Sequence, residues 1–228
     1  MKRQRKLLLL LIMTIGLNSA KSQNLVIGGT GNIGLSKVTS NLPISGDYKT
    51  KFTLSGNMGM FLEKEIGQKS SFGIEVLWVQ IEGKEITENK ELTAFNGQSV
   101  EVIGVISDKS TLHSSYVGIP VYCRFEFGKI GIKGGFQSMI FLFASSNYEA
   151  SGEINGEPYE AKSKTKDIKF DRIGIGPKVG VDYQLNNKFR LRADYYHGLT
   201  DITSAKFPWQ RGIRQFNWGV NYIFGNNE

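Results

Sequence analysis

The chain offers only two imidazole groups to catalysis, at positions 113 and 197. His113 is followed by two serines, and in an extended strand His113 and Ser115 would lie on the same face. A serine beside a histidine is the arrangement of a nucleophile and its base, as in lipid hydrolases. The sequence locates no acidic partner for the pair, and two histidines without carboxylates at ligand spacing do not predict a metal site. We therefore expect His113 and Ser115 to be polar rim residues, and we expect no enzyme activity and no metal. A lipid hydrolase is the less favoured alternative.

Three glycines have the spacing of a dinucleotide-binding loop. Gly28, Gly31 and Gly34 recur every third residue, and Asp47 follows at a distance suited to a ribose hydroxyl. Such a loop binds pyrophosphate only if a helix begins within the glycines. Here the helix would have to run into Pro43, which leaves no room for the next strand before Asp47. An extended strand explains the same residues, so we expect no cofactor.

Charged residues collect on one face of several extended segments. From Arg172 to Leu185 the odd positions are almost all apolar, whereas the even positions carry charge, amide or glycine. The charged residues that we expect on this shared face are Arg124, Lys133, Arg172, Lys178, Arg190, Arg192, Glu63, Glu75, Glu126, Asp182 and Asp194. Basic and acidic groups nearly balance, which favours a network of ion pairs and hydrogen bonds over an ion-binding site.

The strands that would carry these faces alternate with period two along the whole chain. From Arg214 to Phe224, aromatic and apolar residues occupy one side and polar residues the other. Eight strands are expected, near 25–38, 50–64, 71–83, 112–127, 129–145, 168–185, 188–201 and 213–224. Short turns at 65–70, 128 and 186–187 alternate with longer polar segments near 39–49, 84–111, 146–167 and 202–212. This alternation predicts an all-β fold, an eight-stranded antiparallel transmembrane β-barrel with short periplasmic turns and longer outer loops.

In such a barrel the apolar faces contact lipid and the charged faces line the lumen. Eight strands enclose a space just wide enough for side chains, so we expect the charged residues to plug the lumen. A narrow channel for small solutes is the alternative. Trp78, Trp209, Trp218, Tyr195 and Tyr222 are expected in the interfacial aromatic belts.

The first 22 residues are typical of a cleaved signal peptide. Four basic residues precede an apolar run from Leu7 to Leu17, and small residues follow at Ala20 and Ser22. The expected mature barrel is residues 23–228, and it is close to neutral because five of the 28 basic residues lie in the signal. A nucleic-acid partner is therefore not indicated. Cys123 is the only cysteine, which excludes an intrachain disulfide.

Several segments together resemble the small outer-membrane β-barrel domain family, often described as porin-family or PorT-like. The resemblance rests on 116–122, 130–136, 174–181, 189–200 and 218–224, in this order and spacing. It implies a β-barrel in a Gram-negative outer membrane, in contact with outer-membrane lipid and monomeric by default. It does not imply a specific activity. We expect a structural or interaction role, with a protein partner bound through the mixed-charge loops 84–111 and 146–167.

Overall fold

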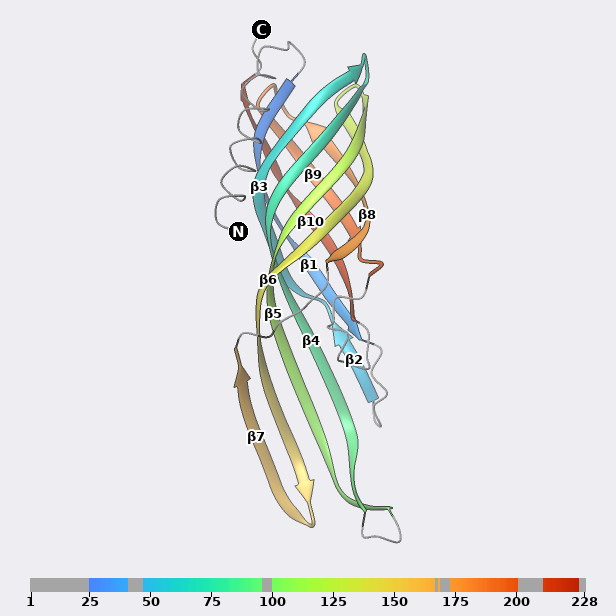
Figure 1. Cartoon of the computed structure of the whole chain (residues 1–228), viewed down its shortest axis with the longest axis vertical. Coiled ribbons are helices and arrows are strands. Elements are labelled where there is room, and N and C mark those ends of the chain that lie inside the picture. Colours follow the sequence, from blue (N-terminus) through green and yellow to red (C-terminus); the bar gives the residue numbers. More distant parts are fainter. Residues whose placement is uncertain are drawn as a thin grey trace, which may run out of the picture.

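The computed structural model describes residues 25–40, 47–95, 100–166, 168, 173–200 and 211–225, and it is built of β-strands (Figure 1). The strands are β1 (Leu25–Ser40), β2 (Asp47–Lys51), β3 (Thr53–Gly67), β4 (Ser70–Phe95), β5 (Val100–Phe127), β6 (Ile130–Ile154), β7 (Glu157–Thr165), β8 (Gly174–Gln184), β9 (Phe189–His197) and β10 (Arg211–Gly225). The expected signal peptide lies outside the described residues. Within the described part of the chain, no helix is both long and apolar enough to span a membrane.

Eight of these strands close into a ring. Each pairs antiparallel with its neighbours in the order β1, β3, β4, β5, β6, β8, β9, β10, and β10 pairs back onto β1. The closing pair is long, since Gly28 to Ser40 of β1 match Ile223 to Arg211 of β10. Closure satisfies the hydrogen-bonding groups of every strand within the barrel, as a lipid environment requires. The eight-stranded antiparallel barrel expected from the sequence is confirmed.

Side chains alternate between the lumen and the outer surface as the period-two pattern predicts. On β8, Val179 and Val181 are 54% and 50% exposed, whereas Lys178 and Asp182 are 7% and 2% exposed. On β10, Phe216 and Trp218 lie outside, and Gln215 and Asn217 lie inside. The exposed apolar side chains therefore form the belt that faces lipid.

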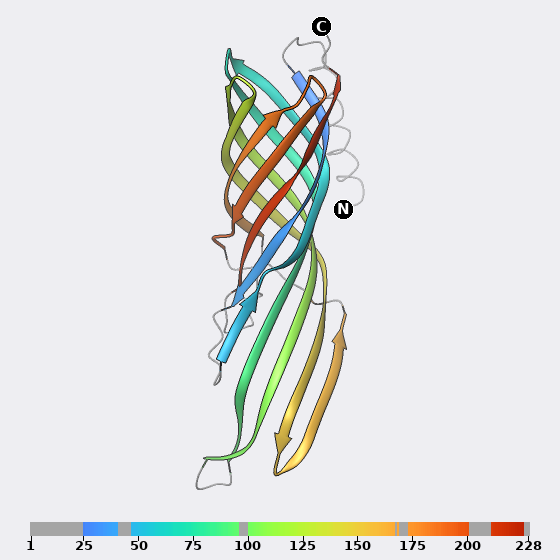
Figure 2. The same cartoon turned by 180° about the vertical axis from the view of Figure 1, so that it is seen from behind.

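The strands are longer than expected at one end of the barrel. Most of the predicted loops 84–111 and 146–167 are strand, because β4 pairs with β5 up to Phe95 and Val100, and β6 pairs with β7. These hairpins extend well beyond the barrel, away from the short turns (Figure 2). Each face of this extension mixes charged and apolar residues, so no apolar face marked it as strand in the sequence. Strand β8 is shorter than expected, because it begins at Gly174 and the sequence predicted a start near residue 168.

Two turns explain how the hairpins reverse. Asn155 and Gly156 both have positive φ, 54° and 79°, which suits the tight two-residue turn between β6 and β7. Gly128, with φ of 63°, makes the turn between β5 and β6. The Asn-Gly pair at 155–156 is a hairpin signal, and it identifies the extra strand β7 inside the segment expected to be a loop.

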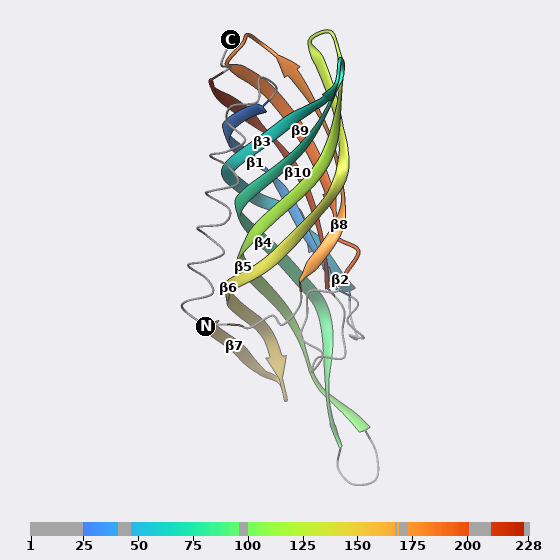
Figure 3. The same ribbon diagram turned by 45° about the horizontal axis from the view of Figure 1, so that its top comes forward.

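One irregularity accounts for a stretch of β6 that is apolar on both faces. The register with β5 shifts after Ser115, which pairs with Phe143, because Tyr116 pairs with Phe141 and Leu142 is left over. This bulge turns both Leu142 and Phe143 outward, 40% and 51% exposed, while Phe141 faces the lumen. Figure 3 shows the tilt of β4, β5 and β6 in the barrel wall.

Candidate functional site

The lumen contains a layer of charged side chains that come from six neighbouring strands, β3, β4, β5, β6, β8 and β9. Arg124 on β5 and Asp182 on β8 form a two-pronged ion pair, with Nε to Oδ2 at 2.9 Å and Nη2 to Oδ1 at 2.7 Å. Lys133 on β6 approaches the same carboxylate at 3.6 Å. Glu126 also contacts Arg124, but its side chain is 46% exposed near the short turns. This group occupies the wall formed by β5, β6 and β8.

Arg192 on β9 lies at the centre of a second group. Its guanidinium lies 3.0 Å from Glu75 and 2.6 Å from Asp194, and it donates to Thr30 and Asn221 at 3.1 Å each. Lys178 approaches Glu75 from β8 at 3.7 Å. Arg192 is only 3% exposed, so all of these contacts are made away from water. They join β9 to β1, β4 and β10, and they join β8 to β4.

A third group pairs strands that are distant in the sequence. Arg190 on β9 makes an ion pair with Glu63 on β3 at 2.5 Å, and the Tyr122 hydroxyl donates to the other oxygen of Glu63 at 2.9 Å. The Tyr122 ring lies over Gly73, where a Cβ would meet the ring at 2.4 Å. A glycine is needed there because the tyrosine crosses the lumen at van der Waals distance.

Ten of the eleven residues expected in the lumen lie in these three groups, and nine of those ten are almost fully buried. The tenth, Glu126, is half-buried at the mouth. The remaining residue, Arg172, lies outside the described residues.

A second, apolar layer lies in the lumen between the charged layer and the extended hairpins, and the sequence did not predict it. Its members share an exposure of at most 2% and an inward position, and they are Val38, Leu77, Val79, Ile81, Tyr116, Met139, Tyr196 and Ile213. Phe141 packs against this layer, with its ring edge-on to Tyr116 at 5.7 Å between centroids. The available signal was that β4 around Leu77 and β6 around Met139 are apolar on both faces.

His113 has an acidic neighbour that the sequence did not reveal. Glu82 on β4 pairs with His113 on β5, and its carboxylate lies 3.4 Å from His113 Nδ1. Ser115 is 4% exposed, whereas His113 is about half exposed. All three residues line a hollow of about 500 Å³ on the outer surface, with apolar Leu54 and Phe143. An acid and a base are thus together, but Ser115 is not hydrogen-bonded to the histidine.

The glycines that suggested a dinucleotide loop lie in strand β1. A Cβ on Gly28 would be 2.3 Å from the Phe61 ring, which fills the lumen beside it, whereas Gly31 faces outward into open space. Close packing thus explains Gly28, and no helix begins in this segment.

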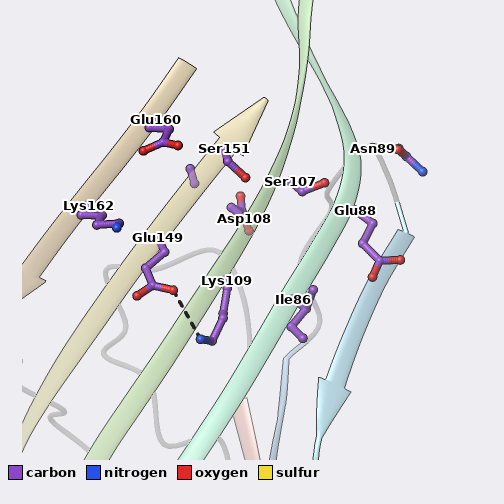
Figure 4. Close-up of a pocket in the computed structure, with 11 residues that line it drawn as sticks. Ile86, Glu88, Asn89, Ser107, Asp108, Lys109, Glu149, Ser151, Glu160 and Lys162 are labelled. Carbon is purple, nitrogen blue, oxygen red and sulfur yellow. Dashed lines mark hydrogen bonds and ion pairs between the residues drawn. The ribbon is translucent and has the colours of Figure 1, made fainter. Parts of the chain in front are cut away.

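Beyond the barrel, five strands continue as an antiparallel sheet. The strand order is β2, β4, β5, β6 and β7, and one row of outward residues runs across all five: Lys49, Ile86, Lys109, Glu149 and Lys162. Four of them, Ile86, Lys109, Glu149 and Lys162, border a hollow of about 630 Å³ (Figure 4).

Ion pairs in this row and its neighbour are exposed. Lys109 lies 3.3 Å from Glu149, and Lys49 lies 2.8 Å from Glu88. The hydrogen bond and charge of Lys49 lower the pKa of Glu88 from its ordinary value. The opposite face of the sheet carries Tyr48 and Tyr148, and burial, followed by the nearby Asp108 carboxylate, raises the pKa of Tyr148. The two faces of the sheet therefore differ in composition.

The family model for the outer membrane protein beta-barrel domain matches residues 19–204. The chain belongs to this family. It is therefore an outer-membrane β-barrel protein of the Gram-negative type, and its exposed apolar belt contacts membrane lipid. No curated protein matches the sequence.

Several solved structures are similar to this barrel. The attachment invasion locus protein Ail of Yersinia pestis, crystallised with the heparin analogue sucrose octasulfate, is 12% identical, with a TM-score of 0.39 over 88% of this chain and 99% of Ail. Neisserial surface protein A is 14% identical, with a TM-score of 0.39 over 87% and 97%. The outer membrane protease OmpT of Escherichia coli is 10% identical, with a TM-score of 0.36 over 88% and 95%.

Proposed function

We propose that this protein is a closed barrel that holds a five-stranded β-sheet outside the membrane as an interaction surface. The observation that carries the proposal is the length of the hairpins. Strand pairing continues to Phe95 and Val100 in one hairpin and to Ile154 and Glu157 in the other, far past the residues needed to close the barrel. A paired sheet presents its side chains in a fixed arrangement, which reduces the entropy lost on binding a partner.

The filling of the lumen supports a role that does not depend on transport. In the charged layer, opposite charges lie within 4 Å of each other and pair. In the apolar layer, the lumen offers few polar groups to hydrogen-bond a continuous row of water molecules. An ion entering from outside would have to cross the apolar layer without its hydration shell, which is costly. We infer that side chains plug the barrel, in preference to the narrow channel for small solutes.

One face of the extended sheet carries Tyr48 and Tyr148, opposite the row of Lys49 and Lys109, and we call it the inner face. It has the composition of a protein-binding surface. Tyr48, Tyr148 and Tyr159 are half-buried there, and tyrosine combines a large apolar ring with a hydroxyl that hydrogen-bonds. Tyr48 donates to Glu85 at 3.0 Å, and Arg211 pairs with the same carboxylate at 2.8 Å, so the base of this face is held in place. We propose a protein partner on this face.

The test uses site-specific photocrosslinking on intact cells. A photoreactive phenylalanine analogue replaces Tyr148 or Tyr159 on the sheet, and Val181 on the lipid-facing belt serves as the control position. The proposal expects a discrete protein adduct from the sheet positions and none from Val181. Absence of adducts from the sheet positions in a correctly assembled protein would contradict it.

A trimmed variant separates the sheet from the barrel. Asn-Gly turns replace residues 86–109 and 148–163, which joins the register partners Glu85 with Ser110 and Asn147 with Lys164. The barrel should still assemble, as judged by its folded mobility in gel electrophoresis, because none of the lumen groups lies in the removed segments. Failure of the trimmed barrel to assemble would show that the sheet is part of the folding unit and not an added surface.

One observation favours a second candidate function, a lipid hydrolase. Glu82, His113 and Ser115 line the same hollow at the outer edge of the lipid-facing surface. If the protein is an interaction surface and not a hydrolase, His113→Ala and Ser115→Ala should leave the acyl composition of the membrane unchanged. Release of fatty acid by the native protein, abolished in both variants, would move the protein to the enzyme class.

A further inference from the structure

Three neighbouring strands carry an acid, a base and a hydroxyl side by side on the outer surface of the barrel. Glu82 on β4 is the direct register partner of His113 on β5, and His113 is in turn the direct partner of Ser145 on β6. Directly opposite residues of antiparallel strands project from the same face, with Cβ atoms about 5 Å apart. The three side chains therefore form one row across the barrel wall, which we call the Glu-His-Ser row.

The imidazole of His113 lies between the other two members of the row. Its Nδ1 lies 3.4 Å from a carboxylate oxygen of Glu82. Strand β6, with Ser145, lies on the other side of β5 from Glu82, so Nε2 at the opposite edge of the ring is the nitrogen available to the serine hydroxyl. With an acid at one ring nitrogen and a serine at the other, the acid orients the ring, and the ring accepts the proton of the serine hydroxyl.

Ser145 is better placed than Ser115 to be the nucleophile of this row. Ser115 follows His113 by two residues on the same strand, which separates them by about 7 Å along the strand. It lies opposite Phe143 and is only 4% exposed. Ser145 is half-buried and lines the same hollow of about 500 Å³ as Glu82 and His113. A substrate in the hollow can therefore reach Ser145, whereas neighbouring side chains cover Ser115.

The surroundings of the Glu-His-Ser row match the two ends of a membrane lipid. On the side of the lipid-facing belt, the hollow is lined by Phe143, 51% exposed, and Leu54, 70% exposed. On the side of the extended sheet, the next row consists of Lys84, Thr111 and Asn147, whose side chains all donate hydrogen bonds. An acyl chain against the belt and a headgroup at the donors would place the ester carbonyl at the row itself.

We propose that Glu82, His113 and Ser145 cleave carboxylic esters of acylated lipids in the outer leaflet. This inference rests on the second candidate function, the lipid hydrolase, and names its nucleophile and its substrate class. The Ser145 oxygen attacks the ester carbonyl carbon and its proton passes to His113, while Thr111 and Asn147 donate hydrogen bonds to the carbonyl oxygen as it gains negative charge. The bond to the alcohol oxygen then breaks, and His113 returns the proton to that oxygen. Water, deprotonated by His113, attacks the acyl carbon, so that the carboxylic acid leaves and Ser145 regains its proton.

The first test measures ester cleavage by the full protein in neutral detergent micelles, with p-nitrophenyl octanoate and p-nitrophenyl acetate as probes. The octanoate should be cleaved roughly tenfold faster or more, because its chain gains contact with the apolar side of the hollow. Ser145→Ala and His113→Ala should each lower the rate by at least about 100-fold, and Glu82→Gln by less. The matched control is Ser146→Ala, which removes the adjacent hydroxyl on the other face of β6, where it is hydrogen-bonded to Ser110, and should keep the native rate.

A fluorophosphonate probe, located by mass spectrometry of peptides, identifies the nucleophile without turnover. The adduct should form on Ser145 of the native protein and should be lost in His113→Ala. Ser115→Ala should lower the rate of ester cleavage much less than Ser145→Ala, because Ser115 only borders the hollow. Circular dichroism and folded gel mobility confirm that each variant is intact.

Vesicles of phosphatidylethanolamine and of an acylated glucosamine glycolipid then distinguish the two sources of a lipid ester. Release of fatty acid from either one supports the proposal and identifies the lipid. Release from neither, with cleavage of the p-nitrophenyl esters alone, would overturn the lipid substrate class.

Two further results would overturn the proposal, and they differ in what they leave standing. An adduct on Ser115, with activity lost in Ser115→Ala and kept in Ser145→Ala, would retain a hydrolase but remove the Glu-His-Ser row as its site. Neither ester cleavage nor an adduct in the intact native protein would remove the hydrolase function and the row together. The interaction surface proposed for the extended sheet would be unaffected by either result.

Discussion

Replacing Arg192 by methionine should be among the most destabilising single changes in the lumen. The guanidinium is 3% exposed, and it contacts Glu75 at 3.0 Å and Asp194 at 2.6 Å. Removing one partner of a buried ion pair costs about 3–5 kcal/mol, because the other charge stays buried without compensation. Lys178 approaches Glu75 at 3.7 Å and compensates part of that loss, whereas Asp194 loses its guanidinium. We therefore expect a loss near the middle of that range, about 4 kcal/mol.

The assay is equilibrium unfolding in urea with vesicles of neutral lipid, followed by the fluorescence of Trp78 and Trp218. The matched control is Arg214→Met, the same substitution on the outer rim, where the side chain is exposed and the expected change is within about 0.5 kcal/mol. Adding Asp194→Asn to Arg192→Met removes the stranded carboxylate and should recover about 1–3 kcal/mol. A loss below about 1 kcal/mol for Arg192→Met, or a double variant less stable than the sum of its parts, would refute the network as described.

Two further substitutions test the assignment of faces and the close packing of the lumen. Val179, 54% exposed in the middle of β8, should cost about 2–4 kcal/mol when changed to arginine because the charge enters the centre of the bilayer; urea unfolding that finds it as tolerant as Val179→Leu would contradict the lipid-facing assignment. Gly28→Val should cost about 1–3 kcal/mol by overpacking, since its Cβ would lie 2.3 Å from the Phe61 ring and 2.3 Å from the Tyr222 carbonyl oxygen. Gly31→Val, three residues away and facing open space, is its control, and equal losses in the two variants would rule out the packing explanation.

The alternation of side chains made the barrel and its faces predictable from the sequence. Period two fixes which side of a strand a residue faces once any one residue is placed, so the inward positions of Lys178 and Asp182 followed directly. Charged residues buried inside a narrow barrel are stable only when they are paired. Their inward positions therefore predicted a network of ion pairs. The identity of each pair, such as Arg190 with Glu63, depends on which strands face each other across the lumen. Alternation along one strand contains no such information.

The features that the sequence did not predict lie in segments whose two strand faces have similar composition. The extended sheet mixes charged and apolar residues on each face, so residues 84–111 looked like a polar loop although β-branched residues such as Ile86, Val102 and Ile106 favour strand. The apolar layer around Leu77 and Met139 has apolar residues on both faces, and the bulge at Leu142 shifts the phase within it. Glu82 lies 31 residues before His113 in the sequence, and only the β4–β5 register brings the two together.

The claim that side chains close the barrel is tested most directly by current recordings in planar bilayers. The protein should insert without any sustained conductance if the charged layer and the apolar layer close the lumen, as we propose. The variant Tyr116→Ala with Met139→Ala, which removes two large side chains from the apolar layer, shows that insertion and current can be detected. A steady ohmic current through the native protein, as large as that of the variant, would contradict a plugged lumen and favour transport.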